Sequence, residues 1–574
     1  MGDHLIPADM YMGERKMKNI WLDSYPAGTP NEIDADAYSS LVALFEQSCQ
    51  RYAEWPAYHN LGVTLTFRDL ERLSGQFAAY LGDLGLARGD RVALMMPNLL
   101  QYPVVLFGVL RAGLVAVNTN PLYTARELRH QLKDSGARCI VIVENFAHVL
   151  ADVIADTPIE HVVTTGIGDL AGFPRRVAVN FVVRRLRHLV PAYTLPGAVK
   201  FRAALARGAG LGVPRPSIGP QDIAFLQYTG GTTGVAKGAM LTHRNMVANV
   251  MQAAAFWKGI LEPGQDVMIT PLPMYHVFCL TVDCLLFLQQ GGLNVLITNP
   301  RDIPAFVQEL RKWRMTLITG VDTLFNALAD YPGFASVDFS RLKVGLAGGM
   351  PLQARTAAKW RAVTGRGIAE GYGLTEASPI VAGNRYDAPR IGGVGLPEPS
   401  TEISIRGDGQ AEAPMGEAGE LCVRGPQVMA GYWNRPDETA DVISSDGWLR
   451  TGDIAVMDPG GYLRIVDRKK DMIIVSGFKV FPNEIESVAA EHPAVLEAGC
   501  IGVPDPHSGQ VVKVFVVVRE SLSVTVDELH EHFSARLTGY KRPKYLEFRQ
   551  ALPKSNIGKV LRRELMREES SRAA

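Results

Sequence analysis

The composition of this 574-residue chain is typical of a globular protein, with 47% hydrophobic and 21% charged residues. Its 59 basic and 59 acidic residues balance, so no overall charge favours nucleic acid or another polyanion as a partner. The 6 cysteines are scattered without a Cys-x-x-Cys pair, which argues against disulfides or a zinc site and favours a reducing compartment. Neither a secretory signal nor a long uncharged apolar run occurs, so we expect a cytoplasmic protein without a transmembrane helix.

Helical and strand-like segments alternate over most of the chain. Phe67 to Leu84 has apolar residues at helical spacing and precedes the short apolar run Arg91 to Pro97. The same order returns at Ala125 to Asp134, followed by Cys139 to Val143, and again after Ile303. This alternation predicts an α/β fold built on parallel sheet with helices on both faces.

The composition and the predicted secondary structure change at two points along the chain. From about Ile391, glycine, proline and short strands become frequent, which predicts a β-rich subdomain. After Asp467 the pattern changes to a compact α+β unit. We therefore predict a large N-terminal domain of stacked α/β subdomains with a β-rich subdomain, residues 1–467, and a small C-terminal domain, residues 468–574.

The strongest local signal is the segment Tyr228 to Gly238, which reads YTGGTTGVAKG and follows an apolar strand. Glycines let backbone N–H groups turn towards phosphate oxygens, and hydroxyl groups and Lys237 add donors and positive charge. It is not a Walker A loop, because Lys237 is followed by glycine and not by serine or threonine. The segment predicts a polyphosphate-binding loop.

This loop resembles the signature of the adenylate-forming superfamily, which contains acyl-CoA synthetases, luciferases and peptide-synthetase adenylation domains. The resemblance covers almost the whole chain and is closest to bacterial long-chain fatty acid–CoA ligases. Gly231 and Ala236 depart from the commonest form of the loop. Further matching motifs follow in the family's order: Pro273 to His276, Gly345 to Gly349, Glu370 to Glu376, Asp446 to Asp453, Ser476 to Lys479 and Pro553 to Lys559.

The resemblance implies a role for each motif. Catalytic roles fall to Lys237, His276, Glu376 and Lys559, with His276 orienting the acyl carboxylate and Glu376 and Thr229 at Mg²⁺. The ATP or AMP site would comprise Thr229, Gly230, Gly231, Thr232, Thr233, Gly234, Lys237, Gly348, Gly349, Tyr372, Gly373, Thr375, Asp453 and Arg468. Within that set, Tyr372 would stack on adenine, and Asp453 and Arg468 would reach the ribose. CoA would contact Ser476, Gly477 and Lys479.

The chemistry that the resemblance implies has two steps. A carboxylate displaces pyrophosphate from ATP, and CoA then takes the acyl group from the adenylate. Lys559 would serve only the first step, so the C-terminal domain would have to move about a hinge near 467–472, centred on Lys470. Mg²⁺ would be the cofactor, with ATP and CoA as co-substrates.

The sequence indicates the identity of the acid substrate less directly than the type of reaction. The apolar stretch Val277 to Leu288 fits either a channel for an alkyl chain or a buried core helix. The family likeness favours a long-chain fatty acid. The alternatives are a medium-chain or aryl acid, an acyl-AMP ligase that loads a carrier protein, and a non-enzymatic acyl-binding accessory protein for membrane uptake.

A basic segment without acidic residues lies between Asp169 and Asp222. Within 175–200 its cations, which stand among apolar residues, are Arg175, Arg176, Arg184, Arg185, Arg187 and Lys200. Such a pattern fits either peripheral contact with anionic lipid on the inner face of the membrane or a solvated basic surface. The oligomeric state stays open, with a homodimer among the alternatives.

Overall fold

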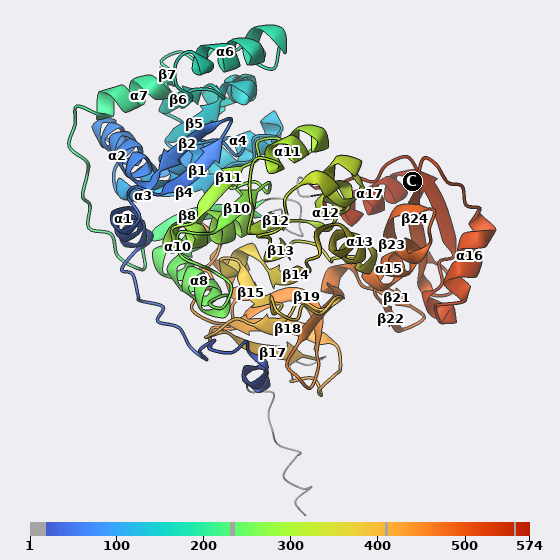
Figure 1. Cartoon of the computed structure of the whole chain (residues 1–574). Coiled ribbons are helices and arrows are strands. Elements are labelled where there is room, and N and C mark those ends of the chain that lie inside the picture. The colour runs from blue at the N-terminus through green and yellow to red at the C-terminus, as the bar shows by residue number, and fades with distance from the viewer. Residues whose placement is uncertain (1–18, 230–235, 408–410, 556–557, 574) are drawn as a thin grey trace, which may run out of the picture.

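The computed structural model of the chain describes residues 19–229, 236–407, 411–555 and 558–573. Figure 1 shows a large body and, beside it near α12 (Asp322–Asp330) and α13 (Ala354–Thr364), a smaller C-terminal unit drawn in red. The body contains two sheets, and one hydrophobic cluster includes residues from both of them, such as Val92 and Leu317. The two sheets therefore share an apolar core.

The first sheet has the strand order β7–β6–β5–β3–β4–β8–β9. Its strands are β3 (Arg91–Met95), β4 (Val115–Asn118), β5 (Cys139–Val143), β6 (His161–Thr165), β7 (Val199–Lys200), β8 (Ile223–Thr229) and β9 (Lys237–Thr242). All neighbours are parallel except β8 and β9, which run antiparallel. This return places Thr229 opposite Lys237 at the two ends of the predicted phosphate loop.

The second sheet has the order β16–β15–β14–β13–β12–β10–β11–β1–β2. Its strands are β1 (Pro56–Asn60), β2 (Val63–Thr66), β10 (Val267–Thr270), β11 (Leu293–Leu296), β12 (Leu317–Gly320), β13 (Val344–Ala347), β14 (Ile368–Gly373), β15 (Ile380–Gly383) and β16 (Leu396–Pro397). The middle is parallel, whereas β1–β2, β14–β15 and β15–β16 are antiparallel. The predicted parallel sheets are thus mixed at their edges. The links between β1 and β2 and between β14 and β15 are too short for a crossover, so these pairs return antiparallel.

Helices begin where the sequence supplies caps. The side chains of Thr66, Thr124 and Thr242 each accept from a backbone N–H in the first turn of a helix, and the side chain three residues on accepts from the backbone N–H of the threonine. The helices of the large body include α1 (Leu41–Arg51), α2 (Phe67–Asp83), α3 (Gln101–Arg111), α4 (Ala125–Ser135), α7 (Phe201–Gly208), α8 (His243–Phe256), α11 (Ile303–Leu310) and α14 (Pro436–Val442). The helix expected over Phe67 to Leu84 thus ends one residue early, and the strand expected over Cys139 to Val143 has those bounds.

Two smaller antiparallel-rich sheets follow. The first consists of β17 (Glu402–Arg406), β18 (Gly419–Arg424), β19 (Leu449–Met457) and β20 (Leu463–Arg468). The second consists of β21 (Ile473–Val475), β22 (Phe478–Val480), β23 (Val495–Asp505), β24 (Gly509–Val518) and β25 (Tyr545–Arg549). Helices α15 (Pro482–Glu491), α16 (Val526–Ser534) and α17 (Arg562–Ala573) accompany the second sheet. Residues 469–472 connect the two sheets and include the short helix η9 (Lys469–Asp471).

Candidate active site

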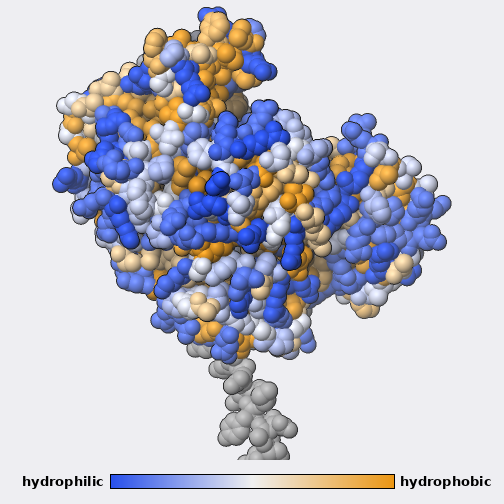
Figure 2. Space-filling view, in the orientation of Figure 1, coloured by the Kyte–Doolittle hydropathy of each residue, from blue (hydrophilic) through white to orange (hydrophobic). Residues whose placement is uncertain are grey.

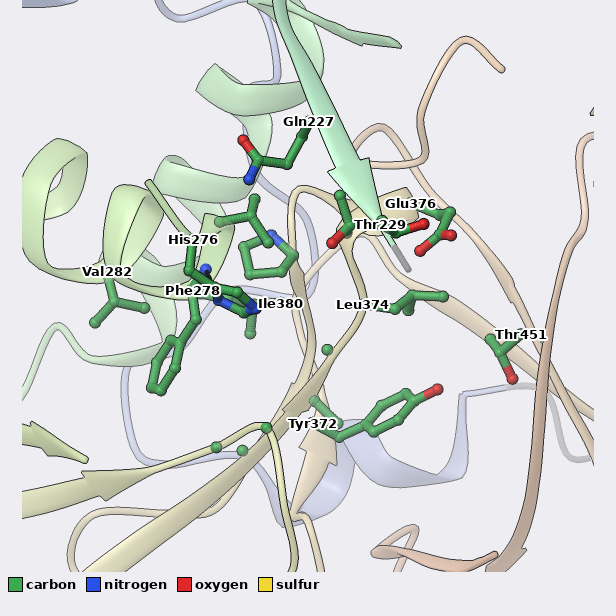
Figure 3. A pocket seen from close by; sticks show the side chains of 18 of the residues that line it. Gln227, Thr229, His276, Phe278, Val282, Tyr372, Leu374, Glu376, Ile380 and Thr451 are labelled. Carbon is green, nitrogen blue, oxygen red and sulfur yellow. Dashed lines mark hydrogen bonds between the residues drawn. The ribbon is translucent and has the colours of Figure 1, made fainter. Parts of the chain in front are cut away.

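A cavity of about 910 Å³ lies where the two large sheets, the β17–β20 sheet and the C-terminal unit meet. Thr229 ends β8, Gly348 and Gly349 follow β13, and Gly373 ends β14. The carboxyl ends of parallel strands are the usual place for ligands in α/β folds. Figure 3 shows Thr229 near Glu376, with His276, Phe278 and Val282 on one side of the cavity and Tyr372 on another.

Most of the residues predicted for ATP and catalysis line this one cavity. They are Thr229, Lys237, His276, Gly348, Gly349, Tyr372, Gly373, Thr375, Glu376, Arg468 and Lys559. The loop residues Gly230, Gly231, Thr232, Thr233 and Gly234 lie outside the described residues. Residues far apart in the sequence therefore converge, which is what a common site requires, while their individual roles stay predictions.

One end of the cavity carries a buried carboxylate held from two sides. The Tyr372 hydroxyl donates to Asp453 Oδ2 at 2.6 Å, and Arg468 Nε lies 2.8 Å from Asp453 Oδ1. Asp453 is 4% exposed, so these partners offset the cost of burying its charge. Burial, followed by the charge of Asp453, raises the pKa of Tyr372 well above its usual value, and the phenol stays a hydrogen-bond donor. Asp453 itself is not part of the cavity lining, and its predicted contact with the ribose stays a prediction.

A second end carries a lysine and two carboxylates. Lys237 Nζ forms an ion pair with Glu438 of α14, and it lies 5.2 Å from the centre of the Tyr432 ring. The Tyr432 hydroxyl donates to Glu376 Oε1 at 2.7 Å. Glu438 and Tyr432 are residues that sequence reasoning missed, because nothing in the local sequence links the segment around 432–438 to Lys237.

His276 stands between the polar ends and an apolar wall. Its Nδ1 accepts a hydrogen bond from the Phe278 backbone at 3.4 Å as the cap of α9 (Val277–Cys279), which leaves the proton of the neutral ring on Nε2. Burial lowers the pKa of His276 to about 4, so the ring is neutral near pH 7. The histidine can therefore donate a hydrogen bond to a carboxylate without adding a charge.

The apolar stretch after His276 is helical and lies against the cavity. It consists of α9, the π-helix η6 (Leu280–Leu286) and α10 (Phe287–Gln290). Apolar side chains on the lining include Ala253, Trp257, Leu261, Val277, Phe278, Val282, Leu286 and Phe287. The helix is buried, as expected for a core helix, and one side of it faces the cavity, while its use as a channel for an alkyl chain stays a prediction.

Lys559 reaches the cavity from the C-terminal unit. It precedes α17, its backbone N–H donates to Ser555 Oγ at 3.1 Å, and its carbonyl accepts from the Ser555 N–H at 2.7 Å. Burial and then the charge of Arg468 lower the pKa of its ammonium group. Lys554 instead pairs with Glu497 at 2.5 Å within the C-terminal unit. The structure thus places Lys559, and not Lys554, at the cavity.

The residues predicted for the hinge and for CoA lie away from the cavity lining. Lys470 is within η9 between the two smaller sheets. Ser476 and Gly477 form the turn between β21 and β22 with φ of 50° and 85°, and Lys479 follows in β22. In this arrangement the hairpin does not line the cavity, and the CoA role of these residues stays a prediction.

Two carboxyl groups on the cavity lining were not predicted from the sequence. Glu398 is 1% exposed and neither of its oxygens has a hydrogen-bond partner among the described residues. Burial raises its pKa to about 8. Burial likewise raises the pKa of Glu370 to about 8, although Glu370 Oε1 accepts from the Leu352 N–H at 3.2 Å. Both groups are therefore neutral or partly ionised near pH 7.

Comparison with known proteins gives the family. A model described as AMP-binding enzyme matches residues 45–433, and one described as AMP-binding enzyme C-terminal domain matches 484–559. The chain belongs to the AMP-binding enzyme family. The resemblance to adenylate-forming enzymes that the motifs indicated is thereby confirmed.

Several relatives match this chain over most of its length. A long-chain-fatty-acid–CoA ligase of Yersinia pestis is 57% identical over 96% of this chain and 98% of its own. A feruloyl-CoA synthase of an Amycolatopsis species is 36% identical over 88% of this chain and 94% of its own. The crystal structure of ATP-bound MatB from Rhodopseudomonas palustris matches with a TM-score of 0.80 and 28% identity over 92% of this chain and 98% of that one. The predicted fold class is confirmed by such structures.

Glu398 gives a prediction about pH and stability. Its pKa in the folded protein, about 8, exceeds the ordinary value of 4.5 expected for the unfolded chain. Below the lower value the group is protonated in both states. Between the two values the unfolded state releases the proton more readily, so stability falls by up to about 1.4 kcal/mol per pH unit as pH rises. Glu398→Gln removes the titrating group. The unfolding midpoint of this variant minus that of the wild type should therefore increase from about pH 5 to pH 8.

Thermal unfolding across that pH range measures the difference. Glu417→Gln, at an exposed glutamate, is the matched control and should follow the wild type at every pH. A difference between Glu398→Gln and the wild type that stays constant with pH would contradict the assignment of a neutral buried carboxyl.

Proposed function

We propose that this chain is a long-chain fatty acid–CoA ligase, which converts ATP, a fatty acid and CoA to acyl-CoA, AMP and pyrophosphate through an acyl-adenylate. One observation carries the proposal. A single cavity joins an apolar wall, the neutral His276, the Tyr372–Asp453–Arg468 group and, from the C-terminal unit, Lys559. The full-length likeness to fatty acid–CoA ligases supports the same activity.

In the first step a carboxylate oxygen attacks the α-phosphorus of ATP and pyrophosphate departs. Both reactants are anions, so catalysis depends mainly on positioned cations that offset their repulsion. Lys237 would hold the β- and γ-phosphates, which requires it to exchange Glu438 for phosphate oxygens. Lys559 would lie between the α-phosphate and the carboxylate and bring them together. His276 would donate from Nε2 to the carboxylate and orient it.

The nucleoside would occupy the end of the cavity near Tyr372. The tyrosine ring offers a face to the adenine, with the strand end at Gly373 and the backbone at Gly348 and Gly349 beside it. Arg468 would reach the ribose, with Asp453 holding the Arg468 side chain in place at 2.8 Å. Thr375 would bond the α-phosphate region.

The donor set fits a magnesium ion bound together with ATP. Among the described residues no group of three or more histidine, cysteine or acidic side chains could hold a metal alone. Mg²⁺ commonly relies on one or two protein oxygens together with water and phosphate oxygens. Glu376, whose Oε1 already accepts from Tyr432, and the Thr229 hydroxyl would hold the ion. When bound, it would neutralise charge on the phosphates.

The second step transfers the acyl group to the CoA thiol, and AMP leaves. Lys559 occupies the region that CoA would have to approach. We infer that residues 468–574 rotate relative to 1–467 about a hinge near 467–472, with Lys470 at its centre. Such a rotation would withdraw Lys559 and bring the turn at Ser476 and Gly477, with Lys479, towards the pantetheine chain.

The wall after His276 favours an alkyl chain as the substituent of the carboxylate. Phe278, Val282 and Leu286 offer hydrocarbon surface, and Trp257 and Leu261 extend it from the end of α8. Burying each methylene contributes about 0.8 kcal/mol, so affinity should rise with chain length until the wall is covered.

Substrate selectivity tests the proposal directly. Release of AMP and formation of thioester should be measured with ATP, CoA and a panel of acids that includes acetate, octanoate, palmitate, oleate and ferulate. We expect the highest kcat/KM on palmitate or oleate. A preference for octanoate or ferulate would contradict the long-chain assignment, and adenylate that forms but never reaches CoA would contradict the CoA ligase.

A separate surface supports contact with a membrane. No helix in the described part of the chain has the length and hydropathy needed to cross a bilayer. However, α6 (Arg175–Phe181) and the π-helix η5 (Val182–Leu186) form a protrusion on which Figure 2 shows apolar residues gathered at the top of the view. Its exposed apolar residues include Phe173, Val177, Phe181, Leu186 and Leu189.

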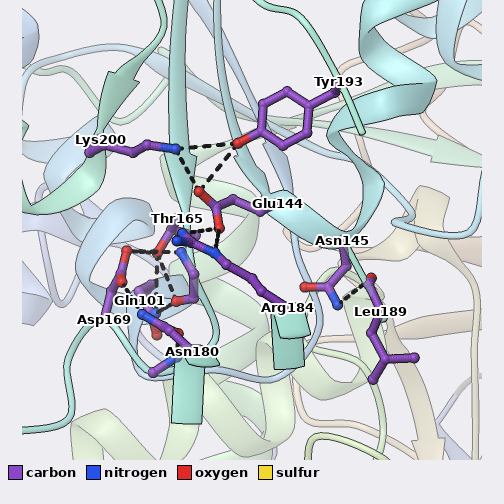
Figure 4. Close-up of polar contacts among 12 residues, drawn as sticks. Gln101, Glu144, Asn145, Thr165, Asp169, Asn180, Arg184, Leu189, Tyr193 and Lys200 are labelled. Atoms are coloured by element: carbon purple, nitrogen blue, oxygen red, sulfur yellow. Dashed lines mark hydrogen bonds and ion pairs between the residues drawn. The ribbon is translucent and has the colours of Figure 1, made fainter. Parts of the chain in front are cut away.

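The basic side of this protrusion is smaller than the sequence suggested. Figure 4 shows Arg184 and Lys200 turned towards the buried Glu144, with Lys200 Nζ 2.6 Å from Glu144 Oε1. Arg175 donates to the Gly62 carbonyl at 2.8 Å. Arg185 and Arg187 are exposed among the apolar residues. We propose that this surface lies peripherally on anionic lipid at the cytoplasmic face of the membrane, where it would meet fatty acid.

Vesicle sedimentation tests the membrane proposal. The wild type should sediment with vesicles that contain phosphatidylglycerol and less with pure phosphatidylcholine, and the double variant Phe181→Asp, Leu186→Asp should stay in the supernatant. Leu522→Asp changes an exposed leucine of the C-terminal unit and serves as the control. Equal sedimentation of the double variant and the wild type would contradict the proposal.

A further inference from the structure

A cluster of charged side chains lies between the β17–β20 sheet and the C-terminal unit, outside the cavity. Arg562, at the start of α17, is its centre. Its Nη1 lies 2.9 Å from Asp467 Oδ1 and 3.4 Å from Asp471 Oδ2, and its Nη2 lies 2.6 Å from Glu486 Oε2. The guanidinium side chain is 11% exposed and that of Asp467 is 0% exposed. These contacts are therefore shielded from water.

The partners of Arg562 belong to two different parts of the chain. Asp467 is a residue of β20, which pairs with β19 in the large body, and its backbone pairs with that of Ile454. Glu486 is on α15, and Asn483 on the same helix accepts from Arg562 as well. A rotation about residues 468–472 would carry Glu486 and Asn483 together with Arg562. The same rotation would separate Arg562 from Asp467.

The cluster also fixes the loop that carries Lys559. Lys559 and Arg562 belong to one short stretch that enters α17, so the position of Arg562 limits where the lysine can lie. On the other side, Asp467 is followed directly by Arg468, which lines the cavity and pairs with Asp453. The contact between Asp467 and Arg562 thus joins the strand that bears Arg468 to the loop that bears Lys559.

We propose that the Asp467–Arg562 contact is a latch that holds the C-terminal unit with Lys559 in the cavity and must open for thioester formation. Asp467 and Arg562 are positioning residues, which act through Lys559 and touch no substrate. The proposal rests on the proposed function, because it assigns the latch to one of the two half-reactions of that activity.

The energetics suit a contact that opens in each catalytic cycle. Asp467 is buried, and it accepts from the backbone N–H groups of Asn483 at 2.6 Å and Arg468 at 2.7 Å in addition to Arg562. Even so, burial keeps the pKa of Asp467 above its usual value. The cost of removing both charges from water offsets much of their attraction, so the net stabilisation of the closed arrangement is modest.

The two half-reactions distinguish a latch from a merely structural ion pair. Adenylation is followed as pyrophosphate release from ATP and palmitate without CoA, and thioester formation is followed from supplied palmitoyl-AMP and CoA. Asp467→Asn should slow adenylation by roughly 10- to 100-fold, because Lys559 is less well placed. Thioester formation should stay near the wild-type rate or rise. Lys559→Ala gives the reference for an enzyme without its lysine, with adenylation lost and thioester formation kept.

Glu486→Gln is the matched control, because it removes a partner of the same guanidinium that moves with it. This variant should affect the two half-reactions alike. Arg562→Lys keeps the charge but loses the forked geometry, and should repeat the imbalance of Asp467→Asn in milder form. Unfolding midpoints show whether each variant is folded.

Equal losses in both half-reactions for Asp467→Asn and for Arg562→Lys, or wild-type rates in both, would overturn the latch. Failure of the proposed function has a different signature. In that case the wild-type protein itself would release no pyrophosphate with palmitate.

Discussion

The structure depends on one electrostatic constraint, which is that a carboxylate and a triphosphate must meet inside a partly apolar cavity. Two unit charges about 4 Å apart repel by about 4 kcal/mol at an effective dielectric constant near 20. Repulsion of that size would slow the reaction by about a thousandfold if nothing opposed it. The protein supplies Lys237 from β9, Arg468 from β20 and Lys559 from the loop before α17, and each lines the cavity. Two of these cations have acidic partners, Glu438 and Asp453 respectively, which lower the cost of holding them there.

In the proposed mechanism the same constraint accounts for a chain in two parts. Lys559 would have to leave before CoA could approach, and it belongs to the C-terminal unit and not to either large sheet. The remaining groups stay with the rigid strand ends, where β8 and β9 place Thr229 opposite Lys237. The buried contact between Asp467 and Arg562 lies at the boundary between the two parts. As the proposed latch, it would couple the occupancy of the cavity by Lys559 to the orientation of the C-terminal unit.

Local sequence patterns were sufficient for the fold class, and the resemblance to the adenylate-forming superfamily implied that the motifs share one site. Helical spacing and apolar strands are encoded within short windows, so the helix that starts at Phe67 and the strand Cys139 to Val143 could be placed directly. Contacts between segments that are distant in the sequence have no such local sequence pattern. The ion pair of Lys237 with Glu438, the hydrogen bond of Tyr372 to Asp453 and the buried carboxyl of Glu398 all join segments that only tertiary packing brings together. The antiparallel edge strands were not predicted for the same reason, because the sequence of one strand does not specify which strand it pairs with.

Transfer of oxygen from the fatty acid to AMP tests the account most directly. The carboxylate oxygen that attacks the α-phosphorus remains on AMP after CoA takes the acyl group. With palmitate labelled with ¹⁸O in its carboxylate, mass spectrometry of the products should show a single labelled oxygen in AMP and none in pyrophosphate. Unlabelled AMP alongside labelled pyrophosphate would show attack at the β-phosphorus, and ADP alongside labelled inorganic phosphate would show attack at the γ-phosphorus. Either result would contradict the mechanism built on this cavity.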